Sequence, residues 1–201
     1  MRFIIRLIYR FLILKPTRPR SRQHGNVRAL DYRTTHDSGT FGGDAFDGIT
    51  NRYNEAKVAH IIDGDTVVVV RGWERYTVRL DSIDCPENGQ HWGDTAKYGL
   101  IKLIGGKKVR LEEHGFDIYG RLLATIYVEH AHKAAWINVN ERMVSLGHAW
   151  VMRGFFGHLP KDRQSKLNRL EWWAKSKKVG LWRTPNPVPP WRWRSGGPSR
   201  N

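Results

Sequence analysis

The sequence predicts a mainly β domain with helices (the α+β class), a five-stranded barrel with about three helices over residues 56–183. Two observations predict it. Five short β-rich segments follow one another, separated by turn-like stretches, and one helical segment stands between the third and the fourth. The five segments are residues 56–62, 66–70, 74–83, 107–114 and 119–128.

Alternation along the third segment indicates how that strand faces its surroundings. Tyr76, Val78 and Leu80 alternate with polar residues, so one face points to a core and the other to solvent or to a site. Nine Trp in the chain supply enough apolar bulk to fill a small barrel.

Helical spacing appears in three segments. Apolar residues from Ala96 to Ile104 form one stripe that ends at Gly105-Gly106. A second helix fits residues 138–147, and residues 148–152 form a short extended piece. Five strands with one helix between the third and fourth is the order of the OB-fold, a barrel frequently used on nucleic acids.

The third helix is expected over residues 160–178, with Lys and Arg on its outer face. Leu167, Leu170 and Trp173 are placed on its inner face. We therefore predict that the pair Trp172-Trp173 belongs to the core.

The net charge of +15 gives a positive potential that attracts polyanions or acidic lipid headgroups. Most of it lies at the ends: residues 1–22 carry seven Arg or Lys and residues 183–201 carry four, with no acid in either segment. The middle is only moderately basic and holds its acids in clusters, as a cation site requires. The only cysteine is Cys85, which excludes an intramolecular disulfide and a cysteine-based zinc site.

The N-terminal segment, residues 1–22, has the pattern of a basic amphipathic helix. Arg2, Arg6 and Arg10 share one helical face beside apolar residues, and the arginines interrupt every apolar run, which argues against a membrane-spanning helix. Three interpretations stay open: a helix on a membrane surface, an atypical targeting leader, or a disordered extension. Residues 23–55 are interpreted as a flexible linker and residues 184–201 as a Pro/Trp/Arg-rich tail.

Acidic and basic residues cluster at three predicted turns. Each alone has a structural explanation, because Asp-Gly is a common turn dipeptide and strand arginines are often surface residues. The turns belong to sequential strands, so all three can meet at one rim of a closed barrel. These residues are Asp63, Asp65, Arg79, Asp84, Glu87 and Arg121.

The chemistry of such a rim follows from its groups. Carboxylate oxygens suit Ca²⁺ or Mg²⁺, and Asp65 and Asp84 are the natural ligands. Arg79 and Arg121 can grip phosphate oxygens and stabilise charge that develops on the phosphoryl group. Glu87 can orient or deprotonate an attacking water.

Three blocks, supported by later segments, carry a family resemblance. The blocks are Asp63-Gly64-Asp65-Thr66, Val78-Arg79-Leu80 with Ile83-Asp84-Cys85-Pro86-Glu87, and Asp117-Ile118-Tyr119-Gly120-Arg121. The later segments are Val139-Asn140-Glu141, Leu146-Gly147-His148-Ala149 and Gly180-Leu181-Trp182. Over roughly residues 56–183 the chain resembles the staphylococcal nuclease family.

The resemblance implies an OB-fold endo- and exonuclease that cuts single-stranded or locally opened DNA and RNA with Ca²⁺. It implies that Asp65, Asp84 and the backbone carbonyl of Cys85 bind the ion. Arg79 and Arg121 would contact the phosphate, and Glu87 would act as the general base. Positions beside the metal or the nucleotide fall on Asp63, Thr66 and Tyr119.

The chain also departs from the family pattern. Cys85 stands where the best-known member has threonine, a change we expect to be tolerated because only the carbonyl binds the ion. Residues 152–162 replace a tyrosine-rich loop, and Phe155 and Phe156 either stack on bases or pack in the domain. A nucleophilic role for Cys85 is not expected, and the tail either packs across the barrel or contacts nucleic acid.

We therefore expect a calcium-dependent nuclease of low sequence specificity. The alternative is a catalytically silent nucleic-acid-binding OB-fold module, which the complete set of acids and arginines disfavours. Expected partners are DNA and RNA, with an anionic membrane surface as a partner for residues 1–22, and the protein is expected to be a monomer. Its expected location is the membrane surface or an exported compartment, reached through the leader, and otherwise the cytoplasm.

Overall fold

The computed structural model describes residues 54–196, and the leader and most of the linker lie outside this range. Its elements in chain order are β1 (Asn54–Ile61), β2 (Thr66–Arg71), β3 (Glu74–Leu80), β4 (Ile83–Asp84), α1 (Gly93–Ile104), β5 (Lys108–Phe116), β6 (Leu122–Glu129), β7 (Trp136–Asn138), α2 (Val139–Ser145), β8 (Trp150–Val151), α3 (Lys161–Ser176), the 3₁₀ turn η2 (Gly180–Arg183) and α4 (Pro190–Arg194).

The five long strands form a closed barrel. The sheet order is β3-β2-β1-β5-β6-β7, and a parallel pairing of β3 with β6 closes it. The closing ladder is short and joins Val78 to Leu122, Arg79 to Leu123 and Leu80 to Ala124. With α1 between β3 and β5, this confirms the predicted OB-fold barrel of the α+β class.

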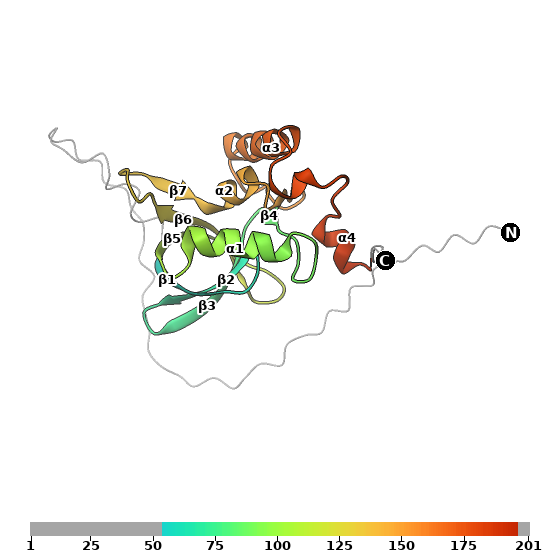
Figure 1. Ribbon diagram of the computed structural model, residues 1–201. Helices are drawn as coiled ribbons and strands as arrows, with labels where there is room; N and C mark the ends of the chain where they lie inside the picture. Colours follow the sequence, from blue (N-terminus) through green and yellow to red (C-terminus); the bar gives the residue numbers. More distant parts are fainter. Residues whose placement is uncertain (1–53, 197–201) are drawn as a thin grey trace. The chain divides into compact units, whose positions relative to one another are not determined.

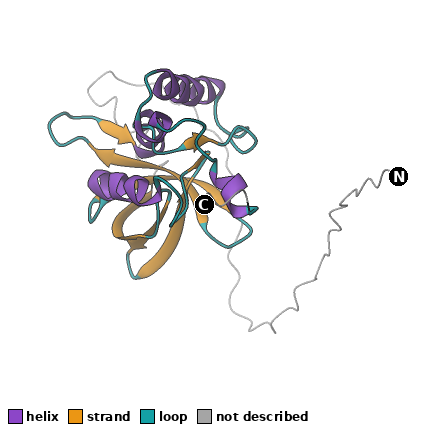
Figure 2. Cartoon of the chain, turned by 45° about the vertical axis from the view of Figure 1, so that its right-hand side comes forward, coloured by secondary structure: helices purple, strands orange, loops and turns teal. Residues whose placement is uncertain are grey.

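The core follows from the two sequence periods. Inward residues of the strands are almost fully buried, and α1 adds Ala96, Leu100 and Ile104 from the predicted stripe. In Figure 1, α1 lies across the barrel, while α2 and α3 lie together on another side; α2 and α3 pack against each other. Figure 2, which views the chain from a second direction, also shows helices (purple) on different sides of the strands (orange).

The prediction for the tryptophans of α3 was wrong. Trp172 is 70% exposed and Trp173 is 45% exposed. The predicted inward position of Leu167 is confirmed, and Leu170 packs half-buried against the core. The buried residues of α3 are Gln164, Leu167, Glu171 and Ala174. Glu171 occupies a core position because its carboxylate accepts from the backbone N–H of Val151, at 3.0 Å, and pairs with Arg153 and Lys175. A charge with these partners can be buried, and the tryptophans then turn outward.

A buried asparagine connects α2 to the seam of the barrel, where β3 pairs with β6. The Asn140 side chain of α2 accepts from Ile126 N at 3.0 Å and donates to the carbonyls of Asp81 at 2.9 Å and Ala124 at 3.2 Å. These carbonyls lie where β3 meets β6. The side chain therefore pairs with the Ile126 amide and the Asp81 carbonyl, and it is a second donor to the Ala124 carbonyl, which also accepts from Asp81 N at 2.9 Å.

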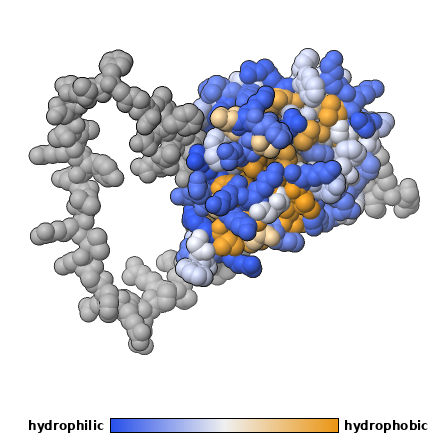
Figure 3. All heavy atoms as spheres, turned by 60° about the vertical axis from the view of Figure 1, so that its left-hand side comes forward, coloured by the Kyte–Doolittle hydropathy of each residue, from blue (hydrophilic) through white to orange (hydrophobic). Residues whose placement is uncertain are grey.

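The described surface is mixed in character. On the face drawn in Figure 3, charged and polar residues surround smaller apolar areas. Among the helices of residues 54–196, none has the length and apolar character needed to cross a membrane.

Candidate active site

The turn between β1 and β2 holds the first two acids. Asp63 Oδ1 accepts from the backbone N–H of Asp65 at 3.0 Å, which fixes this tight turn. A Cβ atom on Gly64 would lie 2.7 Å from Cys85 Cβ and 2.9 Å from Ala96 Cβ. Glycine is therefore required for the turn to press against the β4–α1 segment, and this contact brings Asp65 to Asp84.

Asp65 is a buried carboxylate, only 3% exposed. Its Oδ2 accepts from Cys85 N at 2.7 Å, and its Oδ1 accepts from the Thr66 hydroxyl at 3.0 Å. Burial raises the pKa of Asp65 to about 7, more than the charge of Arg79 lowers it. The carboxylate is thus short of positive charge at this place, which is the condition that favours an added cation.

Arg79 joins the two buried acids. Its Nη1 lies 2.6 Å from Asp65 Oδ1 and its Nη2 lies 2.6 Å from Asp84 Oδ1. Burial alone would lower the pKa of Arg79, but the two carboxylates outweigh it and raise that pKa above its ordinary value. The guanidinium is therefore permanently charged and held in one orientation by both of its terminal nitrogens.

Asp84 and Glu87 are positioned by the short strand β4 and the loop after it. Asp84 is fully buried, and β4 pairs with β8 through Asp84 and Trp150. The Gln90 side chain accepts from Glu87 N at 3.0 Å and donates to the carbonyl of Val188 at 2.6 Å. A Cβ on Gly93 would lie 2.0 Å from the Glu87 carbonyl oxygen, so the loop folds tightly onto the start of α1.

An arginine of the tail also enters this site. Arg194 Nη2 lies 2.8 Å from Asp84 Oδ2, and its Nη1 pairs with Glu87 Oε1. The hydrogen bond to Asp84 is the main cause that raises the pKa of Arg194. The tail thus packs onto the domain, as one of the two sequence interpretations expected, and Trp191 of the same helix packs edge-on to Trp150 with ring centroids 6.3 Å apart.

The third predicted block forms a separate turn on the same side of the barrel seam. Asp117 accepts from the backbone N–H of Tyr119 and of Arg121 at 2.9 Å each, and its Oδ2 pairs with Arg121 Nε at 2.7 Å. Burial would raise the pKa of Asp117, but these hydrogen bonds outweigh burial and lower that pKa. Arg121 stands two residues before Leu123, the β6 partner of Arg79. Tyr119 is 77% exposed, with the Arg121 guanidinium 5.3 Å from its ring centre.

The structure therefore brings most of the predicted residues into one network. Asp65, Arg79, Asp84 and the Cys85 amide are joined by direct contacts, and Glu87 is connected to them through Arg194. Asp63 and Thr66 hold Asp65 in place through the hydrogen bonds given above. Arg121 and Tyr119 lie in the turn held by Asp117, without a direct hydrogen bond or ion pair to the network around Asp65 and Asp84. Sequence reasoning missed two members, Arg194 and Gln90.

Cys85 is excluded as a nucleophile. Its thiol is buried, bonds to the Gly64 carbonyl at 3.2 Å and has its pKa raised well above the ordinary value by burial. A buried thiol with a raised pKa is not ionised at neutral pH. In the loop before α3, Phe156 is 9% exposed and packs in the core, while Phe155 is 69% exposed.

The acids fit a hard cation. The ligands they offer are oxygen atoms, and Asp65 and Asp84 are buried next to each other, both held by Arg79. Oxygen donors of this kind are those that Ca²⁺ and Mg²⁺ prefer. A small barrel with buried acids and arginines at one end offers the groups that metal-dependent phosphodiesterases use.

The comparisons with known proteins identify the family. A family model described as "Staphylococcal nuclease homologue" matches residues 77–184. Protein ParB of Escherichia coli is 40% identical over 141 residues, which are 69% of this chain and 77% of that protein. Micrococcal nuclease of Shigella flexneri is 35% identical over 141 residues, 69% of this chain and 79% of that protein. An uncharacterized endonuclease of Haemophilus influenzae is 37% identical over 142 residues, 70% of this chain and 73% of that protein. The chain belongs to the staphylococcal nuclease family.

Proposed function

We propose that this protein is a calcium-dependent nuclease that hydrolyses phosphodiester bonds of single-stranded or locally opened DNA and RNA. Membership of the family and the names of its relatives support a nuclease. The observation that carries the finer proposal is the pair of buried carboxylates, Asp65 and Asp84, gripped by the two terminal nitrogens of Arg79. A binding module has no need to bury two acids where it must attract polyanionic nucleic acid.

The residues divide into three roles. Asp65, Asp84 and the carbonyl of Cys85 would hold the ion, which when bound supplies positive charge next to the reacting phosphate. Arg79 and Arg121 bind phosphate oxygens and stabilise the charge that develops during attack. Glu87, whose backbone is held by Gln90, orients a water or removes its proton.

Substrate choice follows from the exposed surface beside Arg121. Tyr119 and Phe116, the latter 66% exposed, offer aromatic faces on which unpaired bases can stack. Such stacking tolerates any base, and arginines address the phosphate backbone that DNA and RNA share. Phe155, exposed in the loop before α3, is a further stacking candidate. A strong, salt-insensitive preference for one sequence in a cleavage ladder would contradict this proposal.

The direct test incubates the full-length protein with heat-denatured DNA and with single-stranded RNA, in Ca²⁺ or in chelator. Cleavage in Ca²⁺ and none in chelator is expected. Asp84→Asn is the matched control, because it keeps the shape of the side chain and removes a ligand charge. If folded wild-type protein binds these substrates but leaves them intact in Ca²⁺, the protein is the silent nucleic-acid-binding module instead.

We further propose that residues 1–22 hold the enzyme at an anionic membrane surface. The support is the four-residue spacing of its arginines beside apolar residues. Each basic residue near such a surface contributes on the order of 1 kcal/mol, so seven suffice for reversible binding. Mass spectrometry of fractionated native cells tests this. Intact Met1 in the membrane fraction is expected, whereas a soluble form that starts between residues 16 and 55 would identify a removed targeting leader.

A further inference from the structure

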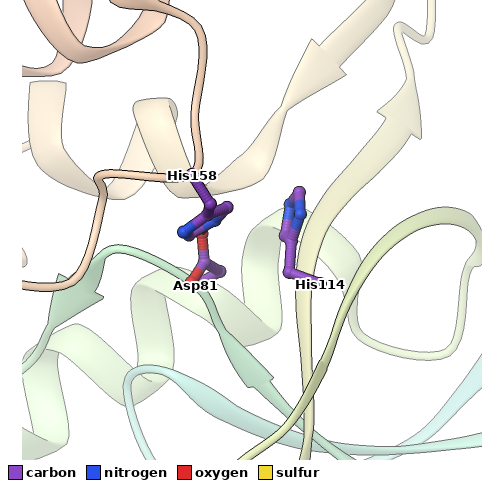
Figure 4. Close-up of side chains that lie close together, drawn as sticks. All are labelled: Asp81, His114 and His158. Atoms are coloured by element: carbon purple, nitrogen blue, oxygen red, sulfur yellow. The ribbon is translucent and has the colours of Figure 1, made fainter.

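A second cluster of metal-binding side chains lies outside the site of Asp65 and Asp84. It consists of Asp81, at the end of β3, His114 of β5, and His158 in the loop before α3 (Figure 4). One ligand atom of each residue lies within 4.8 Å of those of the other two. Three chain segments distant in sequence therefore present two imidazoles and one carboxylate to a common point.

The contacts hold these groups in place without using up their lone pairs. Asp81 is 4% exposed, and its Oδ2 meets His158 Nε2 at 2.9 Å and the Ser82 hydroxyl at 2.6 Å. His114 Nε2 lies 3.0 Å from the Thr125 hydroxyl, so its other ring nitrogen is available to a ligand. The two imidazole rings are 4.7 Å apart between centroids. Within residues 54–196, Asp81 Oδ1 forms no hydrogen bond.

The local charge favours a cation. Arg163 donates from Nη2 to the Thr125 hydroxyl at 2.9 Å, and its Nη1 is paired with Glu112 through contacts of 3.0 and 2.8 Å. Glu112 offsets much of this positive charge, and Asp81 adds a buried negative charge to the cluster.

There is also room beside the carboxylate. A small cavity of about 10 Å³ is bounded by Asp81, Thr125 and Arg163, among other residues. This is close to the space that a single water molecule requires. This space adjoins the Asp81 side of the cluster, and neither His114 nor His158 lines it.

We propose that Asp81, His114 and His158 form a second cation site, which takes Zn²⁺ or a similar transition-metal ion. Two imidazole nitrogens and one carboxylate oxygen are a ligand set that suits Zn²⁺, Co²⁺ and Ni²⁺ rather than Ca²⁺, whose preferred ligands are oxygens. Metal–nitrogen bonds of about 2.0–2.1 Å place the ligand atoms roughly 3.4 Å apart, so the cluster must contract slightly. His158, whose side chain is 38% exposed in a loop, can make this adjustment.

The ion would add a further link between β5, the corner after β3 and the loop before α3, which the Asp81–His158 contact already joins in part. Asp81 lies between Arg79 and Asp84 in the sequence, so a bound metal would clamp the corner that carries both active-site residues. This site and the calcium site are chemically separate, because one uses imidazoles and the other only oxygens. The inference does not rest on the proposed function.

The test titrates Co²⁺ and Zn²⁺ into the metal-free full-length protein, in millimolar Mg²⁺ to occupy hard-ligand sites. Visible absorption detects imidazole ligation of Co²⁺, and calorimetry gives the stoichiometry and affinity for Zn²⁺. One equivalent should bind, and Zn²⁺ should raise the midpoint of thermal unfolding. His158→Asn, which keeps an N–H donor for Asp81, and His114→Asn should each weaken Zn²⁺ binding at least about tenfold, because even the loss of an outer-shell partner of a ligand costs about 10- to 100-fold in metal affinity.

The control variants remove histidines outside the cluster. His60→Asn, on the exposed face of β1, and the double variant of His130 and His132, whose rings are 6.3 Å apart, should leave Zn²⁺ affinity unchanged. The proposal is overturned if wild type binds no Zn²⁺, or if His114→Asn and His158→Asn bind it as wild type does. It is equally overturned if the double variant alone abolishes binding.

Discussion

Arg194→Ala is expected to tighten the binding of Ca²⁺. The guanidinium of Arg194 touches Asp84 Oδ2 at 2.8 Å and also pairs with Glu87. The ion would need the same Asp84 carboxylate, so the two cations compete. Removing the tail arginine removes the competitor while leaving Arg79 on the other carboxylate oxygen.

The size of the effect follows from burial. Loss of one partner of a fully buried ion pair costs roughly 3–5 kcal/mol, whereas exposed pairs are worth about 0–1 kcal/mol. Asp84 is fully buried, but the Arg194 side chain is 45% exposed, so solvent screens much of the attraction. An intermediate value of about 1–2 kcal/mol corresponds to Ca²⁺ affinity that is about 5- to 30-fold higher.

Calorimetric titration of Ca²⁺ into full-length wild type and Arg194→Ala measures this directly. Arg192→Ala is the matched control, because it removes an equal charge from an exposed position of the same short helix. It separates the local contact from the general loss of positive potential. Equal affinity of wild type and Arg194→Ala, or weaker binding by the variant, would refute the competition argument.

Three further substitutions test other parts of the structure. Arg79→Lys keeps the charge but loses the planar fork, so turnover should fall by about 10²–10³; a folded lysine variant with wild-type turnover would remove the bidentate contact from the mechanism. Asp117→Ala should lower turnover by releasing Arg121, with a smaller effect on the thermal unfolding midpoint, and equal turnover would show that the turn does not position this arginine. Glu171→Gln should lower the free energy of unfolding at pH 7 by about 1–3 kcal/mol. Burial would raise the pKa of Glu171, but its hydrogen bonds and ion pairs lower that pKa in the folded protein, so this stabilisation is complete above the unfolded pKa of about 4.5 and is lost as pH falls through the folded pKa. Urea titrations at pH 7 and pH 3.5 should therefore show a smaller difference at the lower pH.

The parts of the site that could be predicted from the sequence are those set by local geometry. Asp63-Gly64-Asp65 and the segment from Asp84 to Glu87 are tight turns at strand ends, and the chain order of the strands brings such turns to one rim. The barrel itself follows from residue alternation and from the position of α1. These are short-range features, so a linear pattern is sufficient to indicate them.

The parts that could not be predicted depend on contacts between distant segments. Arg194 meets Asp84 across 110 residues, and Gln90 reaches the carbonyl of Val188, 98 residues away. No periodicity relates such pairs, although the absence of acids in the tail was a weak signal that its arginines need partners elsewhere. Trp172 was misplaced for a similar reason, since only the tertiary partners of Glu171 allow a charge to displace an aromatic residue from the core.

The Asn140 side chain has a consequence for how the protein melts. If α2 separated from the barrel, the carbonyl of Asp81 and the amide of Ile126 would lose the partner that Asn140 supplies, and the Ala124 carbonyl would keep only the Asp81 amide. Leaving such groups unpaired costs about 1–3 kcal/mol each, so partial detachment of the helical layer is disfavoured. The segment from Arg79 to Asp84 and the helices α2 and α3 should therefore unfold as one cooperative unit. Activity and near-ultraviolet circular dichroism should then be lost at the same temperature. The Ile126 amide should accordingly exchange with solvent only through global unfolding.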